Sequence, residues 1–249
     1  MSNPGPVLNL SAYKFVSLDD LPALRERLLV SAQADGLKGT VLLAKEGINL
    51  FVAGPEPGAR AWLRELHADP RFADITPKES FSNTLPFRRL LVKIKREIIR
   101  MNMPTVRPEG GRAPAVEPAT LARWLDQGHD DEGRPVVTLD TRNAFEVDAG
   151  AFEGAIDWRL HKFSEFPQAL QQHLHELQDK TVVSYCTGGI RCEKAALLMQ
   201  QAGLDHVYQL EGGILKYFEL TEGAPHWRGE CFVFDERVAL DPALAPKAA

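Results

Sequence analysis

The residues best suited to covalent chemistry lie in one short run around Cys186. A β-branched and aromatic stretch, Thr181–Tyr185, precedes Cys186, and Gly188 and Gly189 separate it from a helical sequence. Paired glycines let several backbone amides point into one concavity at a helix N-terminus, where they favour an anion. With Arg191 nearby, we expect the pKa of Cys186 to lie well below the value of about 8.5 for a free thiol. The run therefore predicts a reactive cysteine.

The length of this loop limits what it can hold. Four residues separate Cys186 from Arg191, one fewer than in the wider loop with which cysteine phosphatases hold a tetrahedral phosphate. A shorter loop suits a bound group smaller than phosphate. The alternative is an inert structural cysteine, which would need neither the glycines nor the arginine. We predict Cys186 and Arg191 as catalytic residues and Thr187, Gly188, Gly189, Ile190 and Cys192 as the active-site loop.

The remaining candidates near this site allow two interpretations each. Asp140 and Arg142 stand at the end of an earlier strand sequence, where they either contact the loop or pair within the domain. Cys192 either traps an oxidised form of Cys186 as a disulfide or is an unreactive residue of the first helical turn. Cys231, Phe232 and Phe234 belong to an apolar strand sequence, and we expect them in the core.

The elements that must position the loop predict an α/β protein of two domains. In the second domain, strands near 136, 182 and 207 alternate with helices at 119–127, 168–178 and 192–202, the pattern of an open parallel sheet. In the first domain, the order is strand 12–16, helix 18–34, hairpin strands 40–44 and 48–53, helix 57–68 and strand 90–96. This β-α-β-β-α-β order predicts a ferredoxin-like α+β domain with an antiparallel sheet. Ligands of open parallel sheets bind at the carboxyl ends of strands, which is where Cys186 falls.

We place the boundaries of these parts by composition. The expected parts are a ferredoxin-like domain at 1–102, a Pro/Gly-rich linker at 103–118, the parallel α/β domain at 119–222, and a strand with a disordered tail at 223–249.

A basic segment of the first domain is the candidate for RNA contacts. The proposed RNA-binding residues are Arg88, Arg89, Lys93, Lys95 and Arg96. Strand alternation directs Val92 and Ile94 to the core and Lys93 and Lys95 to solvent. The segment is either a solvated strand face or a set of phosphate contacts, which position RNA without reading its sequence.

The composition excludes several classes of protein. The chain has 249 residues, of which 44% are hydrophobic and 25% charged, and a net charge of −5, which disfavours non-specific binding to nucleic acid. It has neither an apolar run of about eighteen residues nor a secretory signal, so we expect a cytoplasmic protein. Its three cysteines include no Cys-x-x-C pair, which argues against a disulfide framework and a zinc site.

Longer motifs carry a resemblance to a known family. The loop resembles that of rhodaneses, and Val136–Asn143, Gly150–Ile156 and Glu211–Ile214 are similar to other parts of a rhodanese domain. The more specific motifs are Cys186–Lys194, Phe163–Pro167, Glu230–Val238, Glu46–Asn49 and Lys78–Phe81. With these motifs the chain resembles the rhodanese-domain tRNA uridine hydroxylases over roughly residues 12–238.

The resemblance implies a function. Members of the family that the chain resembles carry out oxygen-dependent 5-hydroxylation of the wobble uridine of tRNA. The resemblance therefore implies tRNA as partner and molecular oxygen as co-substrate, with no evident cofactor or metal. Neither DNA nor a membrane is expected as a partner. The resemblance also implies a persulfide or oxidised-sulfur intermediate on Cys186. A plain sulfurtransferase that carries a persulfide and a non-catalytic RNA-binding module remain alternatives.

Overall fold

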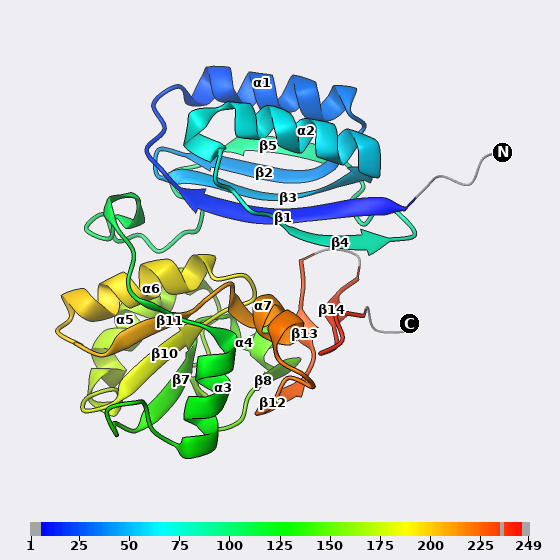
Figure 1. Cartoon of the computed structure of the whole chain (residues 1–249). Coiled ribbons are helices and arrows are strands. Elements are labelled where there is room, and N and C mark those ends of the chain that lie inside the picture. The colour runs from blue at the N-terminus through cyan, green and yellow to red at the C-terminus, as the bar shows by residue number, and fades with distance from the viewer. Residues whose placement is uncertain (1–5, 235–236, 246–249) are drawn as a thin grey trace. The chain divides into compact units, whose positions relative to one another are not determined.

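The chain folds as two compact units, Met1–Ile99 and Arg100–Ala249, in a computed structural model that describes residues 6–234 and 237–245 (Figure 1). Each unit has its own sheet and its own helices. Among the described helices, none is both long enough and apolar enough to cross a membrane.

The first unit is a sheet with two helices on one face (Figure 1). Its elements are β1 (Val7–Phe15), α1 (Leu21–Ala34), β2 (Lys38–Ala44), β3 (Gly47–Pro55), α2 (Glu56–Ala68), β4 (Lys78–Ser82) and β5 (Leu90–Ile94), with a 3-10 turn at Pro70–Phe72. The strand order is β4-β1-β3-β2-β5, and all neighbours are antiparallel except β2 and β5, which are parallel. The predicted ferredoxin-like α+β domain is confirmed, with one strand added.

The added strand corrects two details of the prediction. The fourth strand of the ferredoxin-like pattern is β4, a polar sequence with no buried residue, so it carries no apolar pattern by which to predict it. The expected last strand, β5, is instead an extra edge strand. Val92 is buried there, but Ile94 is 42% exposed, so the expectation that it faces the core is wrong. Ile94 is the last residue of this edge strand, where the sheet ends.

The second unit contains a parallel sheet, as the sequence predicts, with helices on both of its sides. Its elements are β6 (Ala115–Val116), α3 (Pro118–Gln127), β7 (Val136–Asp140), α4 (Ala144–Val147), β8 (Gly150–Phe152), β9 (Ile156–Asp157), α5 (Phe166–His173), β10 (Thr181–Tyr185), α6 (Ile190–Gln201), β11 (Val207–Leu210) and α7 (Gly213–Leu220), with 3-10 turns at Pro108–Gly110, Phe163–Glu165 and Leu174–Glu176. The strand order is β6-β11-β10-β7-β9 and every pair is parallel. Figure 1 shows α5 and α6 on one side of this sheet and α3 and α7 on the other. The central strand, β10, is buried in every residue and leads to Cys186.

Two segments differ from the expected linker and tail. The end of segment 103–118 forms β6, which pairs with the outer edge of β11. Near the C-terminus, β12 (Trp227–Gly229) pairs with β8, and β13 (Cys231–Phe232) pairs with β14 (Ala239–Leu240). Residues 241–245, expected as disordered tail, form a turn in which the Asp241 amide donates to the Ala245 carbonyl at 3.0 Å. Residues 246–249 lie outside the described part.

Candidate active site

Cys186 lies at the carboxyl end of β10, in a loop whose shape depends on glycine. Cys186 is only 1% exposed. Gly189, with φ 103°, precedes the first residue of α6, and its amide donates to Cys186 Sγ at 3.1 Å. A residue with a side chain rarely adopts this φ, so the glycine allows the chain to turn its amide towards the sulfur. The amides at the start of α6 thus surround the sulfur as the sequence predicts.

The start of α7 holds this loop from the other side. The amides of Ile214 and Leu215 donate to the carbonyls of Cys186 and Thr187 at 3.0 and 3.2 Å. Gly213 has a φ of 67°, and a Cβ there would lie 2.4 Å from the carbonyl oxygen of Cys186. Only glycine therefore lets α7 approach the loop this closely. These contacts satisfy two carbonyls of the loop and fix its backbone.

The environment of Cys186 favours its thiolate. Burial alone would raise the pKa of the thiol, but a hydrogen bond from the Cys192 thiol, the charge of Arg191 and the amides of Arg191 and Cys192 hold this pKa well below its ordinary value. Burial and the neighbouring Cys186 raise the pKa of Cys192 well above its ordinary value. Cys192 Sγ also lies 3.6 Å from Thr141 Oγ1. Of the two sulfurs, Cys186 is therefore the one whose thiolate is favoured, and Cys192 is suited to donate to it.

Arg191 is paired with Glu146, a residue to which the sequence alone assigns no role. Two bonds join them, from Nη1 to Oε2 at 2.6 Å and from Nη2 to Oε1 at 2.7 Å, and both side chains are buried. Burial would lower the pKa of Arg191, but Glu146 raises it above its ordinary value. The Asn143 amide donates to the same carboxylate at 3.1 Å in a capping box at the start of α4. The Asn-x-x-Glu spacing is the only local sign of this residue.

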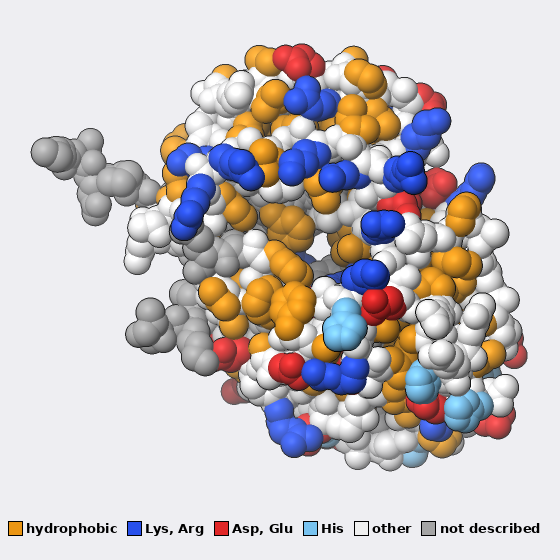
Figure 2. Space-filling model, turned by 180° about the vertical axis from the view of Figure 1, so that it is seen from behind, with side chains coloured by type: hydrophobic (Ala, Val, Ile, Leu, Met, Phe, Trp, Pro, Cys, Tyr) orange, Lys and Arg blue, Asp and Glu red, His pale blue; other side chains and the backbone are white. Residues whose placement is uncertain are grey.

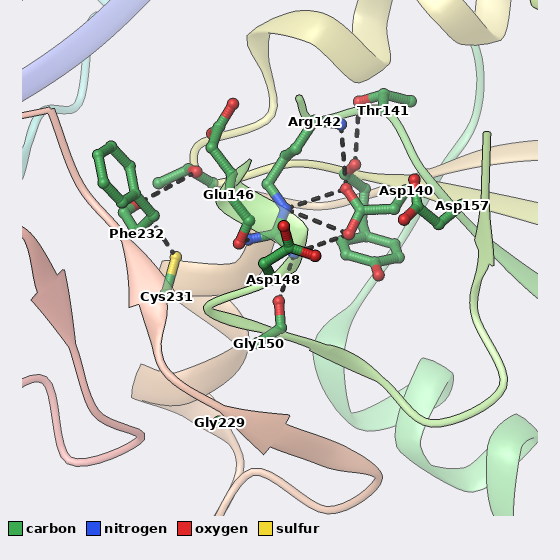
Figure 3. Close-up of polar contacts among 12 residues, drawn as sticks. Asp140, Thr141, Arg142, Glu146, Asp148, Gly150, Asp157, Gly229, Cys231 and Phe232 are labelled. Atoms are coloured by element: carbon green, nitrogen blue, oxygen red, sulfur yellow. Dashed lines mark hydrogen bonds and ion pairs between the residues drawn. The ribbon is translucent and has the colours of Figure 1, made fainter. Parts of the chain in front are cut away.

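Asp140 and Arg142 form a fully buried ion pair that braces the segment carrying Glu146 (Figure 3). Arg142 Nη2 donates to Asp140 Oδ2 at 2.7 Å and to the Gly150 carbonyl at 2.6 Å. Its Nη1 donates to the Glu146 carbonyl at 3.2 Å. The sequence allows two interpretations of Asp140 and Arg142, and these contacts agree with the second, pairing within the domain.

The C-terminal strands pack beside the same segment. Cys231 is buried, as expected of a core residue, and its Sγ lies 3.7 Å from the Phe232 carbonyl (Figure 3). Thr187 Oγ1, next to Cys186, donates to that carbonyl at 3.5 Å. The core prediction is wrong for Phe234, which is 53% exposed, because it lies beyond the end of β13 and so outside the sheet.

The basic residues belong to the first unit. Figure 2 shows Lys and Arg side chains in a row across one face of this unit. All of the predicted RNA-binding residues are exposed, namely Arg88, Arg89, Lys93, Lys95 and Arg96. Lys93 lies in β5, and Lys95 follows the strand, where its amide donates to the Leu43 carbonyl at 2.8 Å.

The described residues bring together one group of site residues in the second unit: Cys186, Arg191, Cys192, Thr141 and Glu146. Within residues 6–234 and 237–245, no three His, Cys, Asp or Glu side chains gather in a way that could hold a metal ion. The arrangement can hold negative charge on a buried sulfur, since amides, a thiol and a guanidinium all favour it.

Comparisons with known proteins cover nearly the whole chain. Residues 7–98 match the family model of the UPF0176 acylphosphatase like domain, and residues 118–220 match that of the rhodanese-like domain. A Delftia acidovorans protein named tRNA uridine(34) hydroxylase is 66% identical over 244 residues, which cover 97% of this chain and 92% of that protein. A Bordetella petrii protein of the same name is 66% identical over 243 residues, which cover 98% of this chain and 96% of that protein.

Proposed function

The chain belongs to the tRNA uridine(34) hydroxylase family, and from this premise we propose that it hydroxylates carbon 5 of the wobble uridine of tRNA with molecular oxygen as co-substrate. The observation that carries the proposal is the thiolate site at Cys186 within a chain that is similar to these hydroxylases from end to end. We expect the protein to act in the cytoplasm, where its substrate is found.

Each site residue has a role in this proposal. Cys186 is the catalytic sulfur, and the Gly189 amide and the Cys192 thiol stabilise its negative charge. Arg191 adds a positive charge, which Glu146 holds in place. A persulfide or an oxidised sulfur on Cys186 also carries negative charge, on the outer sulfur or on oxygen instead of on Sγ, and preorganised amides and a guanidinium at the same loop favour such an anion.

Two further sets of residues support the reaction from outside the sulfur site. Asp140 and Arg142 are positioning residues, because they fix the backbone at Glu146 and Gly150. The exposed basic residues of the first unit bind tRNA phosphates, which contributes affinity that falls as salt rises. A modifying enzyme must also expose the target base, and an anticodon loop is already partly unstacked.

The test uses the purified full-length protein and unmodified tRNA. Under air we expect mass spectrometry of the nucleosides to detect 5-hydroxyuridine at the wobble position, and under nitrogen we expect none. Cys186→Ser should abolish the product, while Cys231→Ser, a control at a buried cysteine outside the loop, should retain it.

Two results would contradict this function. One is a tRNA product that carries sulfur. The other is untouched tRNA together with rapid desulfuration of thiosulfate. Either would identify a sulfurtransferase, since transfer of a persulfide sulfur to an acceptor consumes no oxygen.

A further inference from the structure

Three phenylalanine rings from distant parts of the chain meet at the surface of the second unit. Phe145 of α4 lies with its ring centroid 5.1 Å from that of Phe232 and 6.4 Å from that of Phe234, and the last two rings are 5.2 Å apart. All three pairs are edge-to-face, with interplanar angles of 87°, 89° and 77°. We call these three residues the aromatic cluster.

Two rings of the aromatic cluster are exposed and the third, Phe232, is half-buried, unlike the other phenylalanines of this unit. Phe145 is 49% exposed and Phe234 is 53% exposed. The other described phenylalanines of this unit are each at most 5% exposed, namely Phe152, Phe163, Phe166 and Phe218. Adjoining apolar rings left in water commonly mark a binding surface, whereas scattered exposed apolar residues need no such explanation.

Two connections join the aromatic cluster to the catalytic loop. Phe145 directly precedes Glu146, whose carboxylate makes the two bonds of 2.6 and 2.7 Å to Arg191. Phe232 accepts a hydrogen bond through its carbonyl from Thr187 Oγ1, at 3.5 Å, and Thr187 follows Cys186. A molecule that rests on these rings therefore lies beside the loop that carries the reactive sulfur.

The chemistry of the rings indicates one occupant. An aromatic face binds a nucleobase by stacking, with little dependence on which base it is. When an anticodon base leaves its stack to reach an enzyme, its neighbours lose a stacking partner and can stack on side chains instead. We propose that the aromatic cluster stacks a nucleobase of the anticodon loop and so holds the target uridine towards Cys186. This inference rests on the proposed function.

The first experiment measures binding and turnover of an anticodon stem-loop RNA. Phe145→Leu and Phe234→Leu keep an apolar side chain but remove the ring, so we expect Kd and KM to rise by about tenfold or more, while kcat changes less. Phe145→Tyr and Phe234→Tyr keep the ring and should stay within about threefold of the wild type. Phe81→Leu is the matched control, because Phe81 is 54% exposed in the first unit, and it should change neither constant.

A second experiment detects stacking itself. Stem-loops carrying 2-aminopurine on either side of the wobble position should lose fluorescence when they bind the wild type, and should lose less when they bind Phe145→Leu or Phe234→Leu. Wild-type Kd and KM in both leucine variants would overturn the proposal. The proposal would also be overturned if a leucine variant melts at a lower temperature or elutes at a different volume in gel filtration while the quenching persists. That result would assign the aromatic cluster to a contact within or between protein molecules.

The two experiments distinguish a failure of this inference from a failure of the proposed function. Ring-dependent quenching without any hydroxylated product under air would leave the aromatic cluster as a stacking surface and contradict hydroxylation. Hydroxylation by the leucine variants with the Kd and KM of the wild type would contradict only the stacking role of the aromatic cluster. A wild-type protein that binds no stem-loop would contradict both.

Discussion

At the scale of single residues, the site stabilises a sulfur anion that is buried away from water. A buried thiol would normally stay protonated, because burial disfavours charge. Here the Gly189 amide, the Cys192 thiol and the Arg191 guanidinium compensate for the lost water. Arg191 is itself buried and depends on Glu146. The reactivity of Cys186 and the stability of its surroundings are therefore set by different neighbours, which can be tested separately.

We predict that Cys192→Ala raises the pKa of Cys186, because it removes the thiol that donates to the thiolate. A hydrogen bond to a charged group contributes about 1.5–3 kcal/mol, so alkylation of Cys186 below the midpoint of its pH profile should slow by about tenfold or more. Cys192→Ser keeps a donor and should retain most of the rate. Alkylation measured between pH 4 and pH 9 tests this, and identical profiles for the alanine variant and the wild type would disprove it.

We predict that Glu146→Gln destabilises the protein by about 3–5 kcal/mol, because it removes the buried carboxylate that makes both hydrogen bonds to the Arg191 guanidinium. Urea unfolding measures the loss. Asp148→Asn is the control, since Asp148 is 62% exposed and pairs with Arg159 at the surface, where the unfolding midpoint should hardly change. Similar unfolding midpoints for the two variants would show that the buried ion pair contributes no more to the free energy of unfolding than the exposed pair does.

At the scale of elements, β10 and the starts of α6 and α7 decide where the sulfur lies. β10 is the central strand, and Asp130 anchors its first residue, Thr181, whose Oγ1 donates to Asp130 Oδ2 at 2.5 Å. The amides of Glu132 and Arg134 donate to Asp130 Oδ1, both at 2.9 Å. This one carboxylate therefore joins the turn before β7 to the strand that leads to Cys186.

We predict that the contribution of Asp130 to stability depends on pH. Burial alone would raise its pKa, but the bonds from Thr181 and the two amides lower it to about 2, below the ordinary value of 3.8. Because the folded state has the lower pKa, the stabilisation is complete above about pH 4 and is lost as the pH falls towards 2. Asp130→Ala should cost about 2 kcal/mol near pH 7.

Urea titrations of Asp130→Ala and the wild type between pH 2 and pH 7 measure this dependence. The difference between the two should shrink below about pH 4. Asp131→Ala is the control, because Asp131 is 58% exposed and its ion pair with Arg123 lies at the surface. A difference that stays constant down to pH 2 would contradict the assignment of the shifted carboxyl to Asp130.

At the scale of the whole molecule, two units of different character share one chain. The first unit carries the exposed basic residues and the second carries the reactive sulfur. The net charge of −5 gives the chain no general attraction to RNA, so binding must depend on local groups. Binding of tRNA phosphates and chemistry at Cys186 should therefore respond to changes in different units.

We predict that Lys93→Glu and Lys95→Glu each weaken tRNA binding, because each replaces an exposed positive charge, which we propose contacts tRNA phosphate, with a negative charge that repels it. The slope of log affinity against log salt should become shallower by about one for each variant. Arg64→Glu, an exposed charge reversal on α2 of the same unit, is the control and should change binding less. Alkylation of Cys186 should remain at the wild-type rate in all three variants. Unchanged affinity at low salt would indicate that β5 is merely a solvated edge.

The sequence by itself determined the features that depend on neighbouring residues. The strand, loop and helix around Cys186 could be predicted because the strand, the paired glycines, Cys186 and Arg191 follow one another directly, and the amphipathic helices α2 and α3 because apolar residues recur on one face. The polar strand β4 and the short strands of the second unit carry too little pattern to be found this way.

Only the tertiary structure decided which distant residues complete the site. Glu146 reaches Arg191 across 45 positions of the chain, and the Ile214 amide reaches the Cys186 carbonyl from a different helix. The aromatic cluster likewise forms only when α4 and β13 pack side by side, and Phe234, which the sequence predicts in the core, is exposed there. Such contacts follow from strand order and packing, which bring together residues that share no local pattern.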